Sequence, residues 1–180
     1  NLSDQLSRQI KGFSPEFNIQ PGQTVAVACS SRGLVNYPEI VRTTVDNLKS
    51  MGLDPFLVPA MGSHGAGTAK GQERVLKHLG LTEENVGAKI RSSLEVVELE
   101  KTAEFIPVLV DKLAYEADHI VVINRIKKHT DFIGEFESGL MKLMVIGLGK
   151  IAGAGSYHQA MMSFGSSETI AAGARRVLKH

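Results

Sequence analysis

TVAVACSSRG, residues Thr24 to Gly33, carries the strongest signal of fold class in this chain. Its first seven residues, Thr24 to Ser30, are mostly small or β-branched and lie between turn residues, which is typical of a strand buried on both faces. The next segment, Pro38 to Met51, has apolar residues at helical spacing, a proline at its start and Gly52 just beyond its end. A buried strand followed by a helix predicts a β-α-β unit.

The same alternation of strand and helix continues along the chain. Further strands are predicted at Asp54 to Ala60, Leu94 to Leu99 and Asp118 to Asn124, and further helices at Thr68 to His78 and Val108 to Ala117. This order predicts an α/β fold with an open, mostly parallel sheet and helices on both faces, a Rossmann-like architecture. From residue 125 to residue 159 no period is clear, although Leu140 to Ile146 reads as a short buried helix.

Composition and charge exclude several classes of protein. Lys and Arg number 20 and Asp and Glu 19, so the net charge of +1 gives no reason to expect a nucleic acid partner. The sequence has no apolar run of the roughly 20 residues that a membrane span needs. The single cysteine, Cys29, rules out an internal disulfide. We therefore expect a cytoplasmic protein without nucleic acid or membrane partners, and its oligomeric state stays open.

The length of 180 residues fits one domain, so residues 1–180 are predicted to form a single α/β unit. The chain starts with Asn rather than Met, and its last residues, GARRVLKH, still read as helix. We expect from this a fragment of a longer protein. Glycine is the compositional outlier, with 18 residues in 180 against a usual share of about 7%, which indicates loops where the backbone packs closely or meets a ligand.

Loops that follow predicted strands carry Arg and His side chains. Arg32 lies in SSRG after the first strand, His64 lies in GSHGAG after the second, and His129 lies in NRIKKHTDF after the last. In open α/β sheets, ligands bind beyond the carboxyl ends of the strands. An Arg there can hold a carboxylate or a phosphate, and a His can exchange a proton with a substrate. The structural alternatives are a surface Arg in a turn, an incidental His in a tight glycine turn and a basic surface loop.

Other residues also admit a chemical and a structural interpretation. Lys142 in ESGLMK lies in an apolar stretch, where a desolvated lysine becomes nucleophilic, although taken alone a lysine on a helix flank is the more ordinary case. His158 in GAGSYHQ is a candidate metal ligand or a core histidine. Cys29 is a candidate nucleophile, but a small buried residue is the favoured interpretation. GLGKIAG, Gly147 to Gly153, is only weakly similar to a dinucleotide loop, because no strand and helix flank it in the required order.

Taken together, these residues resemble the N-terminal domain of the nickel-dependent lactate racemase family. In that family an Arg follows the first strand in a DxTR loop, a Gly-x-His loop follows the next strand, and a later His is succeeded by an SGxxK segment. Arg32, His64, His129 and the SGLMK segment ending at Lys142 stand in this order. The metal-binding His of the family comes sixteen residues after the Lys, and His158 is sixteen positions beyond Lys142.

The resemblance implies a cofactor and the residues that hold it. In the family a nickel pincer nucleotide, made of nickel and a pyridinium-derived mononucleotide, is tethered to the Lys of the SGxxK segment. By this resemblance Lys142 would carry the cofactor, Ser138 and Gly139 would line its binding segment, and His158 would be the nickel ligand. The resemblance spans roughly residues 24–159.

The resemblance also implies an activity, the racemisation or epimerisation of a 2-hydroxy acid by hydride transfer to and from the cofactor. His64 and His129 would be the catalytic bases on either face of the substrate, and Arg32 would orient its hydroxyl or carboxylate. An imidazole that titrates near neutral pH suits proton transfer in both directions. The second domain of the family is expected to be absent from this chain.

Two departures from the family indicate a substrate other than lactate. Cys29 stands where the family has the Asp of its DxTR loop, and about three extra residues separate His129 from the SGxxK segment. Two alternatives stay open. The chain could be a nucleotide-binding module without turnover, with Cys29 as the sign of the loss, or an NAD(P)-type oxidoreductase that uses a free cofactor in the same crevice.

Overall fold

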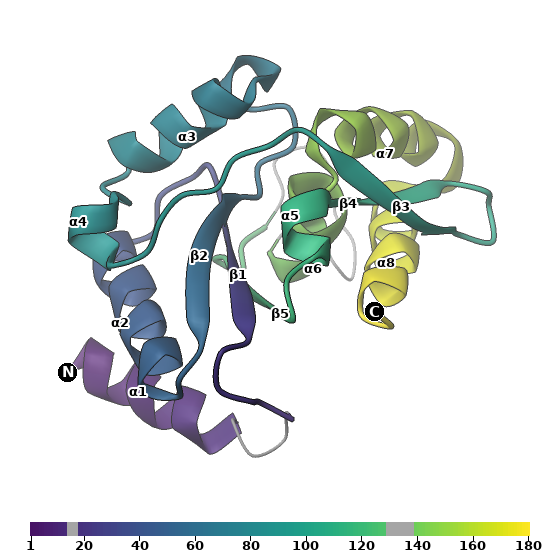
Figure 1. Ribbon diagram of the computed structural model, residues 1–180. Coiled ribbons are helices and arrows are strands. Elements are labelled where there is room, and N and C mark those ends of the chain that lie inside the picture. Colours follow the sequence, from purple (N-terminus) through teal and green to yellow (C-terminus); the bar gives the residue numbers. More distant parts are fainter. Residues whose placement is uncertain (14–17, 129–138) are drawn as a thin grey trace.

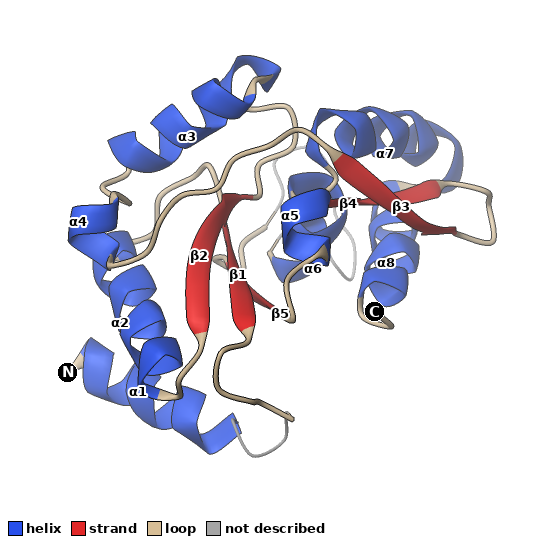
Figure 2. Ribbon diagram, viewed as in Figure 1, coloured by secondary structure: helices blue, strands red, loops and turns tan. Residues whose placement is uncertain are grey.

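Three parallel strands form the centre of the molecule. The structure is a computed structural model that describes residues 1–13, 18–128 and 139–180. Strands β1 (Thr24–Cys29), β2 (Asp54–Pro59) and β5 (His119–Ile123) form a sheet in the order β2-β1-β5, and β1 pairs in parallel with both neighbours. Figures 1 and 2 show this sheet between two groups of helices. The predicted α/β class and the positions of these three strands, within one residue at each end, are confirmed.

Helices account for most of the remaining chain. Their bounds are α1 (Leu2–Phe13), α2 (Tyr37–Ser50), α3 (Ala69–His78), α4 (Glu83–Val86), α5 (Lys112–Tyr115), α6 (Leu140–Lys142), α7 (Lys150–Phe164) and α8 (Ser166–Val177). A 3₁₀ turn, η2 (Gly65–Gly67), precedes α3, and a π-helical turn, η3 (Leu143–Gly147), continues α6. The predicted helices at α2 and α3 are confirmed, and Thr68 caps α3 because its Oγ1 accepts a hydrogen bond of 3.0 Å from the Gly71 N–H.

The central strand is buried on both faces, as its sequence predicts. Successive residues of a strand point to opposite faces of the sheet. Val25, Val27 and Cys29 pack with apolar side chains of α2, α3 and α4, whereas Ala26 and Ala28 pack with Val110, Ala114, Leu143 and Leu148 on the other side. The expectation of helices on both faces is therefore confirmed.

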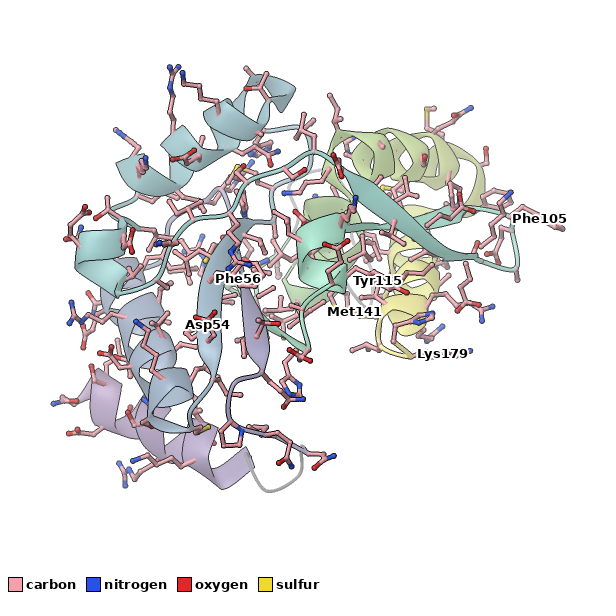
Figure 3. The ribbon with its side chains drawn as sticks, viewed as in Figure 1. Asp54, Phe56, Phe105, Tyr115, Met141 and Lys179 are labelled. Carbon is pink, nitrogen blue, oxygen red and sulfur yellow. The ribbon has the colours of Figure 1, made fainter. Side chains whose placement is uncertain are left out.

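A two-stranded hairpin lies outside the parallel sheet. Strands β3 (Val96–Lys101) and β4 (Pro107–Asp111) pair with each other in antiparallel orientation. The turn between them carries Phe105, which has a φ of 61° and is 81% exposed, and Figure 3 shows it pointing away from the molecule. The strand predicted at Leu94 to Leu99 thus exists, but it belongs to this hairpin rather than to the parallel sheet.

The helix predicted over Val108 to Ala117 is wrong in its first half. Val108 and Val110 alternate with less buried residues in β4 and pack into the core, so burial favours a strand there. Asp111 then ends the strand and starts the four-residue helix α5, because its Oδ1 accepts a hydrogen bond of 3.0 Å from the Ala114 N–H.

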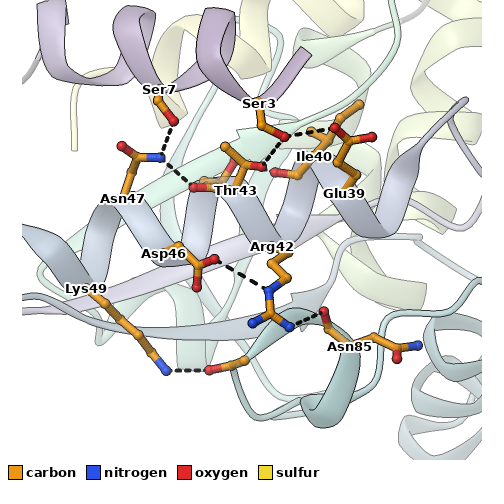
Figure 4. Close-up of polar contacts among 12 residues, drawn as sticks. Ser3, Ser7, Glu39, Ile40, Arg42, Thr43, Asp46, Asn47, Lys49 and Asn85 are labelled. Carbon is orange, nitrogen blue, oxygen red and sulfur yellow. Dashed lines mark hydrogen bonds and ion pairs between the residues drawn. The ribbon is translucent and has the colours of Figure 1, made fainter. Parts of the chain in front are cut away.

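Helix α1 packs against the outer side of α2 through polar contacts (Figure 4). The Ser3 hydroxyl donates to Glu39 at 2.8 Å and accepts from Thr43 Oγ1 at 3.2 Å, while Asn47 Nδ2 donates to the Ser7 hydroxyl at 2.8 Å. These contacts lie on the face of α2 that is turned away from the sheet.

Among the described residues, no helix is long and apolar enough to cross a membrane.

Replacing Leu57 tests the placement of the core. Leu57 lies in β2, is fully buried and packs in the cluster beneath α2 and α3. We expect Leu57→Ala to lower the free energy of unfolding by about 2–5 kcal/mol, because it leaves a cavity in a closely packed core. The matched control Leu178→Ala removes the same atoms from a side chain that is 70% exposed, and should change stability by no more than about 0.5 kcal/mol. Denaturant titration followed by circular dichroism measures both, and equal losses would contradict the assignment.

Candidate active site

A cleft of about 160 Å³ lies at the carboxyl ends of the three parallel strands. β2 and β5 lie on opposite sides of β1, so the connections that leave β1 and enter β5 run to opposite sides of the sheet. Ligand crevices in α/β proteins form at such points, where the strand order reverses. The loops after all three strands and the segment α6–η3 contribute to the cleft. Its lining residues are Ser30, Ser31, Arg32, Ala60, Met61, His64, Asn124, Lys127, Lys142, Leu143, Ile146 and Gly147.

The fold brings three of the predicted site residues into this one cleft. Arg32 follows β1, His64 follows β2, and Lys142 ends α6, so the three come from distant parts of the chain. His129 and Ser138 fall outside the described residues, and their predicted roles stay predictions.

The charge of the cleft suits an anion. The described lining residues include the cations Arg32, Lys127 and Lys142 and no acidic side chain. Arg donates in a planar fork that matches a carboxylate or phosphate, and Lys acts as a compact point charge. The apolar residues Met61, Leu143 and Ile146 complete the wall. The arrangement can therefore bind a small anionic molecule that also has an apolar part.

The GSHGAG loop presents His64 from a tightly packed backbone. Gly62, Gly65 and Gly67 have φ values of 59°, 66° and 62°, in the left-handed region that favours glycine. A Cβ on Gly62 would lie 3.1 Å from the Ile146 carbonyl oxygen. The glycines thus let the loop pack against η3, while the His64 side chain stays exposed.

Ser31 fixes the orientation of the His64 ring. The Ser31 hydroxyl lies 2.6 Å from His64 Nδ1, within hydrogen-bond distance. This bond occupies Nδ1, so proton exchange with a substrate would use Nε2. Sequence reasoning did not single out Ser31, because a serine beside Arg32 in a turn is common. Only the fold brings the SSRG loop and the GSHGAG loop together.

Gly139 turns the chain into the helix that carries Lys142. Its φ of 119° and ψ of −142° are unfavourable for a residue with a side chain. Its carbonyl accepts a hydrogen bond of 2.9 Å from Asn124 Nδ2, which ties the segment to the end of β5. Lys142 is half-buried in the cleft wall. The predicted short helix over Leu140 to Ile146 is present as α6 and the π-helical turn η3, a form often found at functional sites.

His158 lies on α7 and does not line the cleft. It is exposed, which excludes the interpretation as a core histidine. Residues seven positions apart share a helix face, so His158 lies on the same side of α7 as Ile151, which contacts the Gly67 position of the GSHGAG loop. Within the described ranges, no three His, Cys, Asp or Glu side chains are grouped to hold a metal ion.

Cys29 is a buried residue of β1 rather than a nucleophile. Its side chain is fully buried in the cluster beneath α2 and is not among the cleft residues. Burial raises the pKa of its thiol to about 12, so the reactive thiolate is absent near neutral pH. The position at which this chain departs from the family's Asp therefore does not form part of the cleft wall.

GLGKIAG is a packing motif and not a dinucleotide loop. It begins at the end of η3 and runs into α7, with no strand before it. A Cβ on Gly147 would lie 2.8 Å from the Ala60 carbonyl oxygen. The glycine there lets the backbone pass directly against the segment that follows β2.

Comparison with family models matches residues 5–169 to a model described as the lactate racemase N-terminal domain. The match covers all three strand ends of the cleft and reaches into α8. No curated protein matches the chain.

Thiol labelling tests the burial of Cys29. We expect the native protein to leave a disulfide reagent such as dithionitrobenzoate almost unreacted at pH 8, because the pKa of the buried thiol is raised to about 12. Unfolding in guanidinium chloride should release one reactive thiol per chain. Ser50→Cys, at the exposed end of α2, is the control and should add one thiol that reacts without unfolding. Rapid native labelling of Cys29 would show that this position is open to solvent.

Proposed function

Because this chain belongs to the lactate racemase N-terminal domain family, we propose that it is the cofactor-binding part of a racemase or epimerase acting on a 2-hydroxy acid. One observation carries the proposal: Arg32, His64 and Lys142, three residues far apart in sequence, line a single cleft at the carboxyl ends of the parallel strands. A lysine, an imidazole and a guanidinium together supply a tether, a base and an anion-binding group.

The residues of the cleft suit a nucleotide attached through a lysine. Lys142 lies in the wall beside apolar residues, and Arg32 and Lys127 can hold a phosphate or a carboxylate. We propose that Lys142 carries the nickel pincer nucleotide, with Ser138 and Gly139 in its binding segment. His158, on α7 outside the cleft wall, is proposed as a nickel ligand on the resemblance to the family, since imidazole is a good ligand for nickel. When bound, this cofactor supplies the acceptor and donor of hydride.

The side chains of the cleft would bind the substrate and transfer its hydroxyl proton. Arg32 binds the carboxylate of the 2-hydroxy acid and fixes its orientation. His64, held through Nδ1 by Ser31, removes and returns the hydroxyl proton at Nε2. Inversion needs a base on each face of the substrate, and we assign the second to His129 on the resemblance to the family. The substrate side chain would lie against Met61 and Ile146.

Replacing His64 tests the proposed activity. In full-length protein loaded with cofactor, we expect His64→Ala to lower kcat for inversion of its 2-hydroxy acid by about 10²- to 10⁴-fold, the usual contribution of a general base. His78→Ala, at the exposed end of α3, is the matched control and should retain activity. Chiral chromatography of a panel of 2-hydroxy acids after incubation measures both variants. Cofactor-loaded wild-type protein that inverts none of the panel would indicate a binding module instead.

A further inference from the structure

We propose that Lys150 is a positioning residue for His64, acting through a buried network that fixes the backbone carbonyls of the GSHGAG loop. The inference rests on the proposed function for the role of His64 alone. The position of the loop itself is a property of the fold and can be measured without any activity.

Lys150 contacts three groups in the interior of the protein. Its side chain and that of Asp111 are both fully buried, and Lys150 Nζ lies 2.7 Å from Asp111 Oδ2. The same ammonium donates to the Pro59 carbonyl oxygen at 2.5 Å and to Gln72 Oε1 at 3.4 Å. The ammonium is thus held by one ion pair and two hydrogen bonds.

Two of these groups, the Pro59 carbonyl and the Gln72 amide, connect Lys150 to the GSHGAG loop. Pro59 is the last residue of β2, so its carbonyl marks the point where the loop leaves the sheet. Gln72, fully buried in α3, donates from Nε2 to the Gly62 carbonyl at 2.7 Å and to the His64 carbonyl at 3.3 Å. Lys150 orients the Gln72 amide by binding its oxygen, and the amide nitrogen then holds the loop at two points.

Stability alone does not account for this lysine. A buried ion pair loses much of its attraction to desolvation, and apolar residues of similar size often serve as well. Desolvation lowers the pKa of Lys150, and the carboxylate of Asp111 opposes this effect. Lys150 also has a φ of 55°, a backbone conformation unfavourable for a residue with a side chain. Lys150 is costly in both respects, yet it binds the start of the loop at Pro59 directly and the Gly62 and His64 carbonyls through Gln72. The position of that loop best explains such a residue.

The test compares His64 in variants that remove the network without leaving an unpaired buried charge. Lys150→Met combined with Asp111→Asn is neutral, and the Asn side-chain oxygen can still cap α5. Gln72→Leu removes the hydrogen bonds from Gln72 to the Gly62 and His64 carbonyls together with the long bond that Gln72 Oε1 accepts from Lys150, and it leaves the ion pair intact. Ser31→Ala is the positive control, since it breaks the bond to His64 directly. Lys112→Met, which removes the exposed pair with Glu95, is the negative control.

The measurement is the nitrogen-15 NMR spectrum of the histidine rings in the full chain, with the His64 signals assigned by their loss in His64→Gln. We expect wild-type protein and Lys112→Met to show His64 as one tautomer. In the double variant, Gln72→Leu and Ser31→Ala, the two ring nitrogen shifts should move toward their average. In cofactor-loaded protein, kcat should fall about 10- to 100-fold with a smaller change in KM, as for a misplaced catalytic group.

The outcomes separate the two proposals. If the double variant folds and loses the His64 tautomer, Lys150 positions the loop, even where wild-type protein proves inactive and the proposed function fails. The same loss in Gln72→Leu supports Gln72 as the link between Lys150 and the loop. If the variants that fold keep the wild-type His64 spectrum, the inference is overturned, because the network then only joins β4 to α7. If the double variant does not fold, Gln72→Leu still tests the link through which Lys150 would act, since it alters no charge, and an unchanged His64 spectrum in it overturns the inference.

Discussion

The geometry of the cleft depends on the buried ion pair between Asp111 and Lys150. Asp111 ends β4, Lys150 begins α7, and the ammonium also binds the carbonyl at the end of β2. Removing one partner would leave an uncompensated charge in the core. The pair and the bond to Pro59 thus join the hairpin, the C-terminal helices and the parallel sheet at one point. That arrangement sets the GSHGAG loop against η3, where Gly62 N–H donates to the Gly147 carbonyl at 3.1 Å.

The order of the strands explains why the functional side chains meet. With β1 in the centre, the loops after β1, β2 and β5 open at the same end of the sheet. Contacts between loops then refine the site, namely the bond from Ser31 to His64 and the bond from Asn124 to Gly139. The sheet brings the loops near one another. The two polar contacts then orient the His64 ring and tie the segment that carries Lys142 to the end of β5.

Local sequence signals were sufficient for the parallel sheet and insufficient for what packs beside it. The apolar runs of β1 and β2 are continuous because these two strands are covered on both faces, whereas β5, at the edge of the sheet, has no fully buried residue and leaves Ile120 39% exposed. Helix α7 has no amphipathic period over Gly153 to Ser156, where small residues allow close packing, so the sequence did not predict it. Val108 and Val110 were predicted to lie in a helix, and only their burial in the tertiary structure shows that they form a strand.

No local sequence pattern indicated roles for Lys150 and Ser31, because those roles come from partners distant in sequence. Arg32, His64 and Lys142 were found through the order and spacing of a known family pattern.

Mass spectrometry of protein from a host that makes the nickel pincer nucleotide tests most directly whether this cleft holds a tethered cofactor. Intact mass followed by peptide mapping should place an added pyridinium-derived mononucleotide on the peptide that contains Lys142. Lys142→Arg should lose the added mass, and Lys127→Arg, a change to another lysine of the same cleft, should keep it. An unmodified Lys142 in protein from that host, or the same mass on a different residue, would contradict the account.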